Sequence, residues 1–105
     1  MYIIRGKIVN NYPQSRSHIL IKATIEDYNK NPIDRKLAYA GNIFTERELQ
    51  TITIDELEKA YKNKTGENNA NMNIQLGDSV PFMIVFYNLP DSISEFVVET
   101  ISSSP

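Results

Sequence analysis

The sequence predicts a mainly β domain: an immunoglobulin-like antiparallel β-sandwich that carries a short helical insertion at about residues 45–63. Several segments alternate apolar and polar residues with the two-residue period of a half-buried strand. They are not separated by the regular helices that parallel sheets need as crossovers, so we expect antiparallel pairing. One stretch in the middle of the chain carries helix-start signals instead. The main alternative is an open sheet with the helices packed on one face.

Length and composition are those of an ordinary globular domain. The 105 residues fit one domain, 1–105, with a single core. Eleven basic residues are spread along most of the chain beside thirteen acidic ones, whereas a nucleic-acid surface needs clustered Lys and Arg, so we expect no nucleic-acid partner. The absence of cysteine excludes disulfides and thiolate chemistry. No apolar run is long enough for a membrane span, which predicts a soluble domain.

The first two strands have the clearest patterns. Residues 2–10 place Ile4, Gly6 and Ile8 at a spacing of two, with basic residues between them. The cleanest alternation covers residues 18–27. Because side chains of a strand point alternately to its two faces, one face of this segment is predicted to be buried. That face carries Ile19, Ile21, Ala23 and Ile25.

A hairpin is predicted next, followed by a return strand. Residues 28–32 read YNKNP, and Asn tolerates the left-handed backbone of tight connections. The chain is then expected to return through residues 33–40. One side of this strand carries Ile33, Arg35, Leu37 and Tyr39.

Two more strands close the sequence. Residues 80–87 are apolar at both odd and even positions, which is typical of a central strand covered on both sides. The segment EFVVETIS follows a turn, and we expect Phe96 and Val98 to point inward. The terminal SSSP is predicted to be loose. The pattern leaves room for a sixth or seventh short strand in 39–45 or 70–76.

The helical insertion, residues 41–76, contains two successive helix starts of the same design. Thr45 is followed three residues later by Glu48, and Thr53 by Glu56. In such a capping box the Thr hydroxyl accepts the third helical N–H, and the Glu carboxylate reaches back to the N–H of the cap. The signals therefore predict two short helices in tandem.

The second of these helices is expected to end near Asn63, with Gly66 suited to its stop. Its apolar stripe is predicted to consist of Ile54, Leu57 and Tyr61. The following NNANMN is too rich in asparagine for a regular element, so residues 68–73 are predicted to form a loop.

Motifs that could carry catalysis or a cofactor are better explained by structure. His18 is the only histidine, and its neighbour Ser17 is expected to point to the opposite face of the strand. Residues 27–31 resemble the opening of a calcium loop, but Pro32 and Ala38 occupy the positions that need Gly and Glu, so a hairpin is favoured. We predict no catalytic residue, no metal site and no cofactor.

Paired acidic residues have an equally ordinary explanation. Asp55 with Glu56, and Glu46 with Glu48, fall in the first turns of the predicted helices. Acids are favoured there by the positive end of the helix dipole. Helix capping is therefore preferred to a general acid and base pair.

The insertion is the feature that a plain sandwich needs least, and insertions of this size carry function or cover an exposed edge. One hypothesis is that it forms a partner-binding surface with Phe44, Tyr61 and Met72 as its apolar residues. The alternative is that these residues only dock the helices on the sheet. A pocket between the helices and the sheet would instead indicate a small-ligand-binding domain.

Four segments of the chain resemble a bacterial domain of unknown function, DUF3426. They are GKIVNNYPQSRSHILIKATIED, YAGNIF, LGDSVPFMIVFYNLPD and EFVVETISS, and together they cover nearly the whole chain. The resemblance rests on the Asn-Asn turn after the first strand, on the corner at 39–43, and on the PF and NLP signatures of the stretch 77–90.

The resemblance implies a location and a context. Members of this family commonly place the domain after an N-terminal zinc ribbon and a single transmembrane helix. A periplasmic, extracytoplasmic β-sandwich is therefore implied, attached to the membrane only through a segment that this chain does not contain. The function we expect is a non-enzymatic protein–protein interaction module that binds another envelope protein, with small-ligand binding as the alternative. An exposed edge strand would also allow a homo-oligomer.

Overall fold

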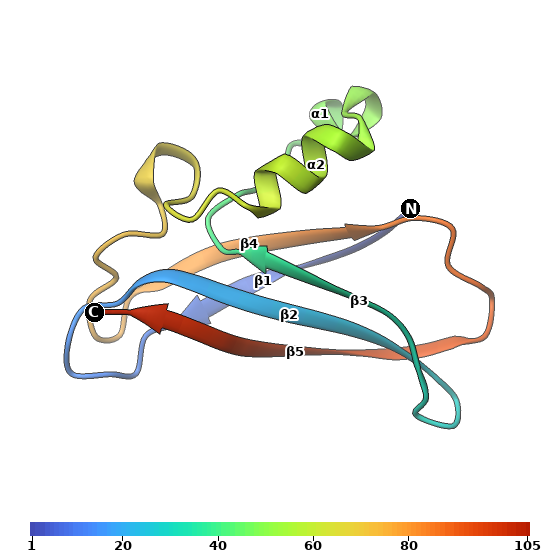
Figure 1. Cartoon of the computed structure of the whole chain (residues 1–105), viewed down its shortest axis with the longest axis horizontal. Coiled ribbons are helices and arrows are strands. Elements are labelled where there is room, and N and C mark those ends of the chain that lie inside the picture. Colours follow the sequence, from blue (N-terminus) through green and yellow to red (C-terminus); the bar gives the residue numbers. More distant parts are fainter.

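The computed structural model describes residues 1–105 and contains five strands and two short α-helices (Figure 1). No helix in it is long and apolar enough to cross a membrane. In chain order the elements are β1 (Tyr2–Val9), β2 (Ser17–Asp27), β3 (Pro32–Tyr39), α1 (Glu46–Thr51), α2 (Ile54–Tyr61), the short 3₁₀-helix η1 (Glu67–Asn69), β4 (Ser79–Phe86) and β5 (Ile93–Ser104).

The strands form two antiparallel sheets, which confirms a mainly β fold. One sheet has the order β1-β4 and the other the order β3-β2-β5. Buried residues of both sheets and of both helices belong to one hydrophobic cluster. The helices lie along the side of the domain that holds β3 and β4, and β5 runs along the opposite side (Figure 1). The insertion is therefore attached to one side of a two-sheet core.

Strand β2 is the centre of the larger sheet, and its predicted alternation is confirmed. The core-facing residues Ile19, Ile21, Ala23 and Ile25 are each at most 3% exposed. Branched side chains suit such a pleated, packed surface. In the smaller sheet, Ile4 of β1 lies opposite Ile84 of β4 and is 2% exposed, as the pattern of the first strand predicts.

Strand β3 presents Leu37 outward and Ala38 inward. Ala38 lies opposite the buried Ile21 and is itself 2% exposed, so this face looks into the core. Of the predicted common face of Ile33, Arg35, Leu37 and Tyr39, the last three residues are consequently on the outer side, with Leu37 54% exposed, whereas Ile33 lies at a register irregularity and packs against the core. This arrangement places Lys36 on the inner face, beside the insertion.

Strand β4 is buried on both faces as predicted, with both Ile84 and Val85 at most 1% exposed. The prediction that it is a central strand is wrong, because it pairs with β1 alone. Its other edge is covered by the insertion, which supplies Tyr61 and the backbone of Gly41. A continuous apolar run indicates that a strand is buried on both faces. In this domain a helix and a loop cover the edge of β4 in place of a neighbouring strand.

Strand β5 differs from its prediction at two points. Val98 packs against the core, but Phe96 is 48% exposed even though it lies opposite the buried Ile25. The reason is that β5 is an edge strand, so half of the ring has no neighbour. The terminal serines are also not loose, because β5 extends to Ser104 and the Arg16 side chain binds Ser103.

Both predicted capping boxes are present in the insertion. The Thr45 hydroxyl accepts the Glu48 N–H at 3.1 Å, and the Glu48 carboxylate accepts the Thr45 N–H at 3.0 Å. Thr53 and Glu56 repeat the pair of bonds at 3.1 Å each. The acids of these first turns are therefore helix caps, as predicted.

The end of α2 and its apolar stripe differ in detail from the prediction. The helix ends at Tyr61, with Lys62 as its C-cap, and Ile54 is 59% exposed. Leu57 and Tyr61 alone form the buried stripe. Gly66 has a different role: its φ of 73° and its position 2.9 Å from the Asn71 nitrogen, measured from where a Cβ would stand, require glycine at a close backbone crossing.

The asparagine-rich segment after η1 contains the main anchor of the insertion. Residues 70–76 form no strand, only an isolated bridge between Arg16 and Ile74, and 39–45 adds no strand beyond the end of β3. Asn71 is fully buried at 0% exposure. Its side-chain oxygen accepts the Ile19 N–H at 3.0 Å, and its side-chain amide donates to the Ile19 carbonyl at 3.1 Å. One side chain thus pairs with β2 as a strand would.

Replacing Asn71 with Ala is expected to lower the free energy of unfolding by about 1 to 3 kcal/mol, because it leaves the buried Ile19 N–H without a partner, while the Ile19 carbonyl keeps its bond from the Ala40 N–H. Urea unfolding followed by circular dichroism measures the loss. The control is Asn31→Ala in the exposed β2–β3 turn, which should change stability by less than about 0.5 kcal/mol. Equal effects of the two substitutions would show that Asn71 is not an anchor.

Candidate functional site

The three residues predicted to form an interaction surface do not lie on one surface. Tyr61 is 4% exposed and contacts Val85 of β4, so the prediction that it belongs to an interaction surface is wrong. Phe44 is half-buried against the core, and Met72 is half-buried in the segment after η1. For Tyr61 the alternative holds: it docks the helix on the sheet. A role of Phe44 or Met72 in partner binding stays a prediction.

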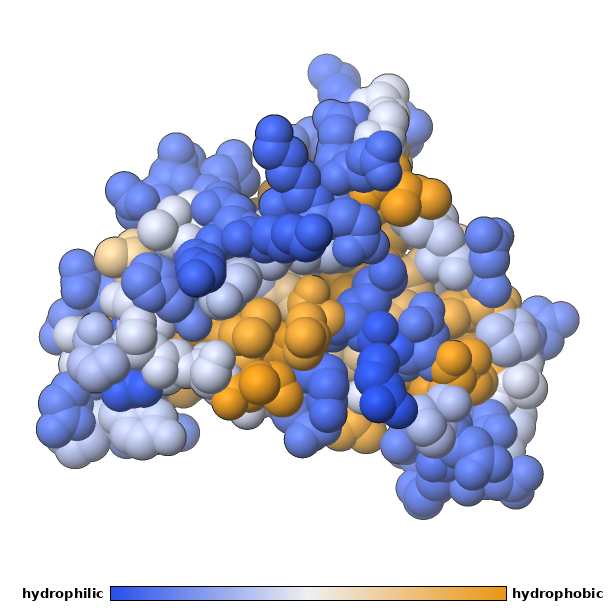
Figure 2. Space-filling view, in the orientation of Figure 1, coloured by the Kyte–Doolittle hydropathy of each residue, from blue (hydrophilic) through white to orange (hydrophobic).

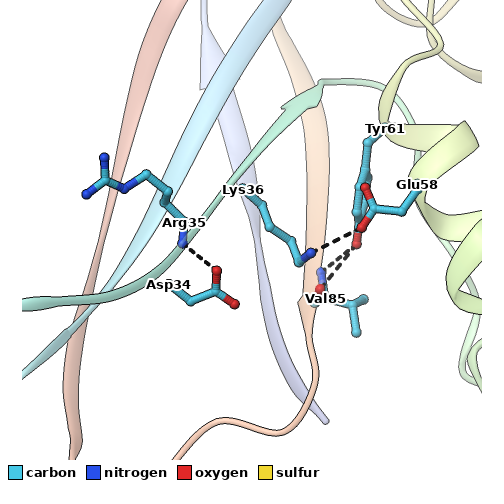
Figure 3. Close-up of polar contacts among 6 residues, drawn as sticks. All are labelled: Asp34, Arg35, Lys36, Glu58, Tyr61 and Val85. Atoms are coloured by element: carbon cyan, nitrogen blue, oxygen red, sulfur yellow. Dashed lines mark hydrogen bonds and ion pairs between the residues drawn. The ribbon is translucent and has the colours of Figure 1, made fainter.

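The Tyr61 hydroxyl seals the free edge of β4 (Figure 3). It accepts the Val85 N–H at 2.9 Å and donates to the Val85 carbonyl at 3.4 Å. Both bonds go to backbone groups that a further strand would otherwise satisfy. The insertion therefore covers an exposed edge, which is one of the two roles that its length suggests.

A charged pair holds α2 against β3 beside this contact. The Lys36 ammonium lies 3.1 Å from the Glu58 carboxylate (Figure 3). It also lies 5.9 Å from the centre of the Phe86 ring. The space left between helix and sheet is about 110 Å³ and is lined by residues that include Leu57 and Tyr87. This volume is well below the several hundred Å³ of usual ligand pockets. The space beneath Leu57 is therefore a packed contact, and small-ligand binding between helices and sheet stays a prediction.

Removing the Tyr61 hydroxyl should weaken the closed side of the domain. The Tyr61→Phe variant keeps the ring but leaves the Val85 peptide groups unpaired in a buried place, so we expect a loss of about 1 to 3 kcal/mol in unfolding free energy. Chemical denaturation measures it. Tyr28→Phe, at an exposed turn position, is the matched control and should be neutral. An unchanged stability of Tyr61→Phe would contradict the sealing role.

The same hydroxyl predicts that the difference in stability between wild type and Tyr61→Phe changes at high pH. Burial raises the pKa of Tyr61 to about 12, against an opposing effect of the Val85 hydrogen bond. The folded state therefore holds the phenol proton more tightly than the unfolded state. This stabilisation is complete below the unfolded value near pH 10 and is lost as the pH rises from about 10 to 12. The stability gap between wild type and Tyr61→Phe should narrow over that range, and a constant gap would oppose this assignment.

The opposite side of the domain is open. It is formed by β1 and β5, which belong to different sheets and each have one strand neighbour. Tyr2 and Phe96 touch edge-to-face across it, with ring centres 6.5 Å apart. Further along the same two strands lies a cleft of about 400 Å³, the β1–β5 cleft. It is lined by Ile8, Val9, Asn10, Asn11, Tyr12, Arg16, Ile19, Thr100, Ile101, Ser102 and Ser103.

The two free edges differ in how well they are protected against pairing with another chain. Strand β1 carries Arg5 and Lys7, and charged residues of this kind discourage edge pairing. Strand β5 is 12 residues long and contains no Lys, Arg or Pro. Its two acids each form an ion pair within the domain, Glu95 with a lysine at 2.7 Å and Glu99 with another at 3.6 Å, and both remain about half exposed. Strand β5 is thus the unprotected edge.

Apolar side chains are exposed on and near β5. Val97 is 40% exposed and Ile101 47%, and Leu37 of β3 is 54% exposed on the outer face of the same sheet. In Figure 2, hydrophobic residues gather over this three-stranded sheet between hydrophilic ones. Exposed apolar groups beside an unpaired strand edge are typical of an interaction site.

His18 is held in a structural contact. It adopts a positive φ of 55° where the β2–β5 register shifts, and its Nδ1 lies 2.8 Å from the Ser104 hydroxyl. Ser17 points elsewhere, accepting the Asn73 N–H, so the predicted divergence of Ser17 and His18 is confirmed. No cluster of three His, Cys, Asp or Glu side chains is close enough to hold a metal ion.

The supposed calcium segment is a hairpin turn, as predicted. The Asp27 carboxylate accepts the N–H groups of Asn29 and Asn31 at 2.8 and 2.9 Å. The turn connects β2 to its antiparallel neighbour β3. The carboxylate therefore caps a turn, which matches the preference stated from the sequence.

Fold and site together define a small mainly β domain with two antiparallel sheets, one side closed by a helical insertion and the other left open at an unprotected strand edge. The chain belongs to a family described as "Protein of unknown function (DUF3426)", whose model matches residues 1–100. This confirms the family resemblance found in the sequence, while the zinc ribbon and membrane helix that it implies stay predictions. Neither the curated proteins nor the solved structures contain a match to the chain.

Proposed function

We propose that this domain is a protein–protein interaction module whose partner adds an extended strand to the free edge of β5. The observation that carries the proposal is that β5 has one strand neighbour along 12 residues and no Lys, Arg or Pro to discourage a second. Added strands bind through main-chain hydrogen bonds, and alternate side chains supply specificity. Val97 and Ile101 are the exposed apolar residues that such a strand would cover.

The family resemblance supports the wider setting that we propose for the module. We place the domain outside the cytoplasmic membrane, as the end of a membrane-anchored bacterial protein, with another envelope protein as its partner. Two antiparallel sheets around one core support an immunoglobulin-like sandwich, a fold whose edges and loops serve binding. The function assigned in this way is non-enzymatic.

A different protein is favoured over a second copy of the chain. If two β5 strands paired antiparallel about Val97, Glu95 of each copy would lie opposite Glu99 of the other. Like charges directly opposite one another destabilise a strand pair. A homo-oligomer through this edge would therefore need another register, away from the exposed valine.

Site-directed photo-crosslinking in cells that produce the full-length protein tests the proposal. A photoreactive amino acid at Ser94, an exposed position of β5, should capture a defined partner, whereas the same group at Lys59 of α2 should not. Adding Val97→Lys should reduce capture from Ser94 at least five-fold, because an edge lysine opposes strand addition.

The matched control is Ile54→Lys, which introduces the same charge at an exposed apolar residue of α2 and should leave capture unchanged. Circular dichroism of the purified variants verifies that both remain folded. Capture from Lys59 instead of Ser94, or capture that resists Val97→Lys, would place the interface on the insertion and refute strand addition.

A further inference from the structure

The β1–β5 cleft has the size and lining of a small-molecule site. Its volume of about 400 Å³ lies within the range of usual ligand pockets. The cleft is bounded by the end of β1, the loop after it and the last residues of β5, which meet at one end of the domain (Figure 1). Its apolar walls are Ile8, Val9, Ile19 and Ile101. Val9 and Ile101 are 50% and 47% exposed, so these walls are open to a ligand.

The same cleft contains an arginine without an acidic partner. Arg16 is half-buried, and the ion pairs of the domain all involve lysines instead. Its Nε and Nη2 donate to the hydroxyl and carbonyl of Ser103, each at 2.8 Å. Both contacts use one edge of the guanidinium, which leaves the hydrogens of Nη1 and one of Nη2 for another acceptor.

The position of this guanidinium is fixed by the rest of the structure. The main chain of Arg16 exchanges hydrogen bonds with Ile74 at 2.9 and 2.8 Å. Its guanidinium carbon lies 5.0 Å from the centre of the Tyr12 ring, and that residue is held in turn by the Asn10 carboxamide. A fixed fork of N–H donors loses little entropy on binding and matches a planar carboxylate.

We infer that the β1–β5 cleft binds an aliphatic carboxylate, with its carboxylate on Arg16 and its hydrocarbon chain along Ile8, Val9 and Ile101. A half-buried cation lacking a counter-ion gains most from an anionic partner, and the walls beside it favour an apolar chain. The same chemistry is offered by a free short-chain acid and by the C-terminal residue of a peptide. The site shares Ile101 with the edge of β5 that an added strand would cover, but ligand binding in the cleft does not require strand addition.

Binding of hexanoate, followed by amide chemical shifts of the ¹⁵N-labelled chain, tests the inference. Saturable shifts are expected at residues 8–12, 16–19 and 100–103, and hexylamine should bind at least ten-fold more weakly, because it repels the guanidinium. N-acetyl-leucine and its amide distinguish the two sources of the carboxylate. Tighter binding of N-acetyl-leucine than of hexanoate identifies a peptide C-terminus, and the reverse order identifies a free acid. Either order supports the site.

Arg16→Met should weaken hexanoate binding at least five-fold, whereas Arg35→Met, at an exposed arginine of β3, should leave it unchanged. Thr100→Phe, which narrows the cleft from β5 and retains Arg16, should also reduce binding and guards against an effect of Arg16→Met on folding alone. Equal affinity for hexanoate and hexylamine, or shifts outside the cleft, would overturn the inference.

Discussion

The pairing of the Tyr61 hydroxyl with the Val85 peptide is the interaction on which the arrangement of this domain depends. Two sheets of two and three strands have four free edges. The insertion covers the side where β3 and β4 meet, with Tyr61 on β4 and a Lys36–Glu58 ion pair on β3. The side formed by β1 and β5 stays open, so the candidate binding surfaces lie there.

Asparagine side chains hold this insertion in place. Asn71 pairs with Ile19 of β2, while Asn42 donates to the carbonyl of Asn63 at 3.0 Å and so ties the start of the insertion to the end of α2. Both asparagines are at most 5% exposed. Short amides satisfy irregular backbone at low entropic cost, which explains how a long excursion is ordered without a core of its own.

Periodicity and capping chemistry were sufficient to predict most elements, because both depend on residues close in sequence. The alternation in β2 and the boxes at Thr45 and Thr53 are examples. The docking of Tyr61 was one of the two stated alternatives, but the burial of Asn71 and the bonding of the Tyr61 hydroxyl to Val85 were not predictable, since each depends on a contact with a distant strand. For the candidate site, the lack of Lys, Arg and Pro in β5 could be seen in the sequence. That β5 lies at a free edge could be known only from the order of the strands in the sheet.

Amide hydrogen exchange tests most directly whether one side is closed and the other open. The Val85 amide, bound to the Tyr61 hydroxyl, should exchange as slowly as amides paired between β1 and β4. Those amides of β5 that face away from β2 should exchange much faster. Fast exchange at Val85 together with uniform protection along β5 would mean that the insertion does not seal β4 and that the edge of β5 is not free.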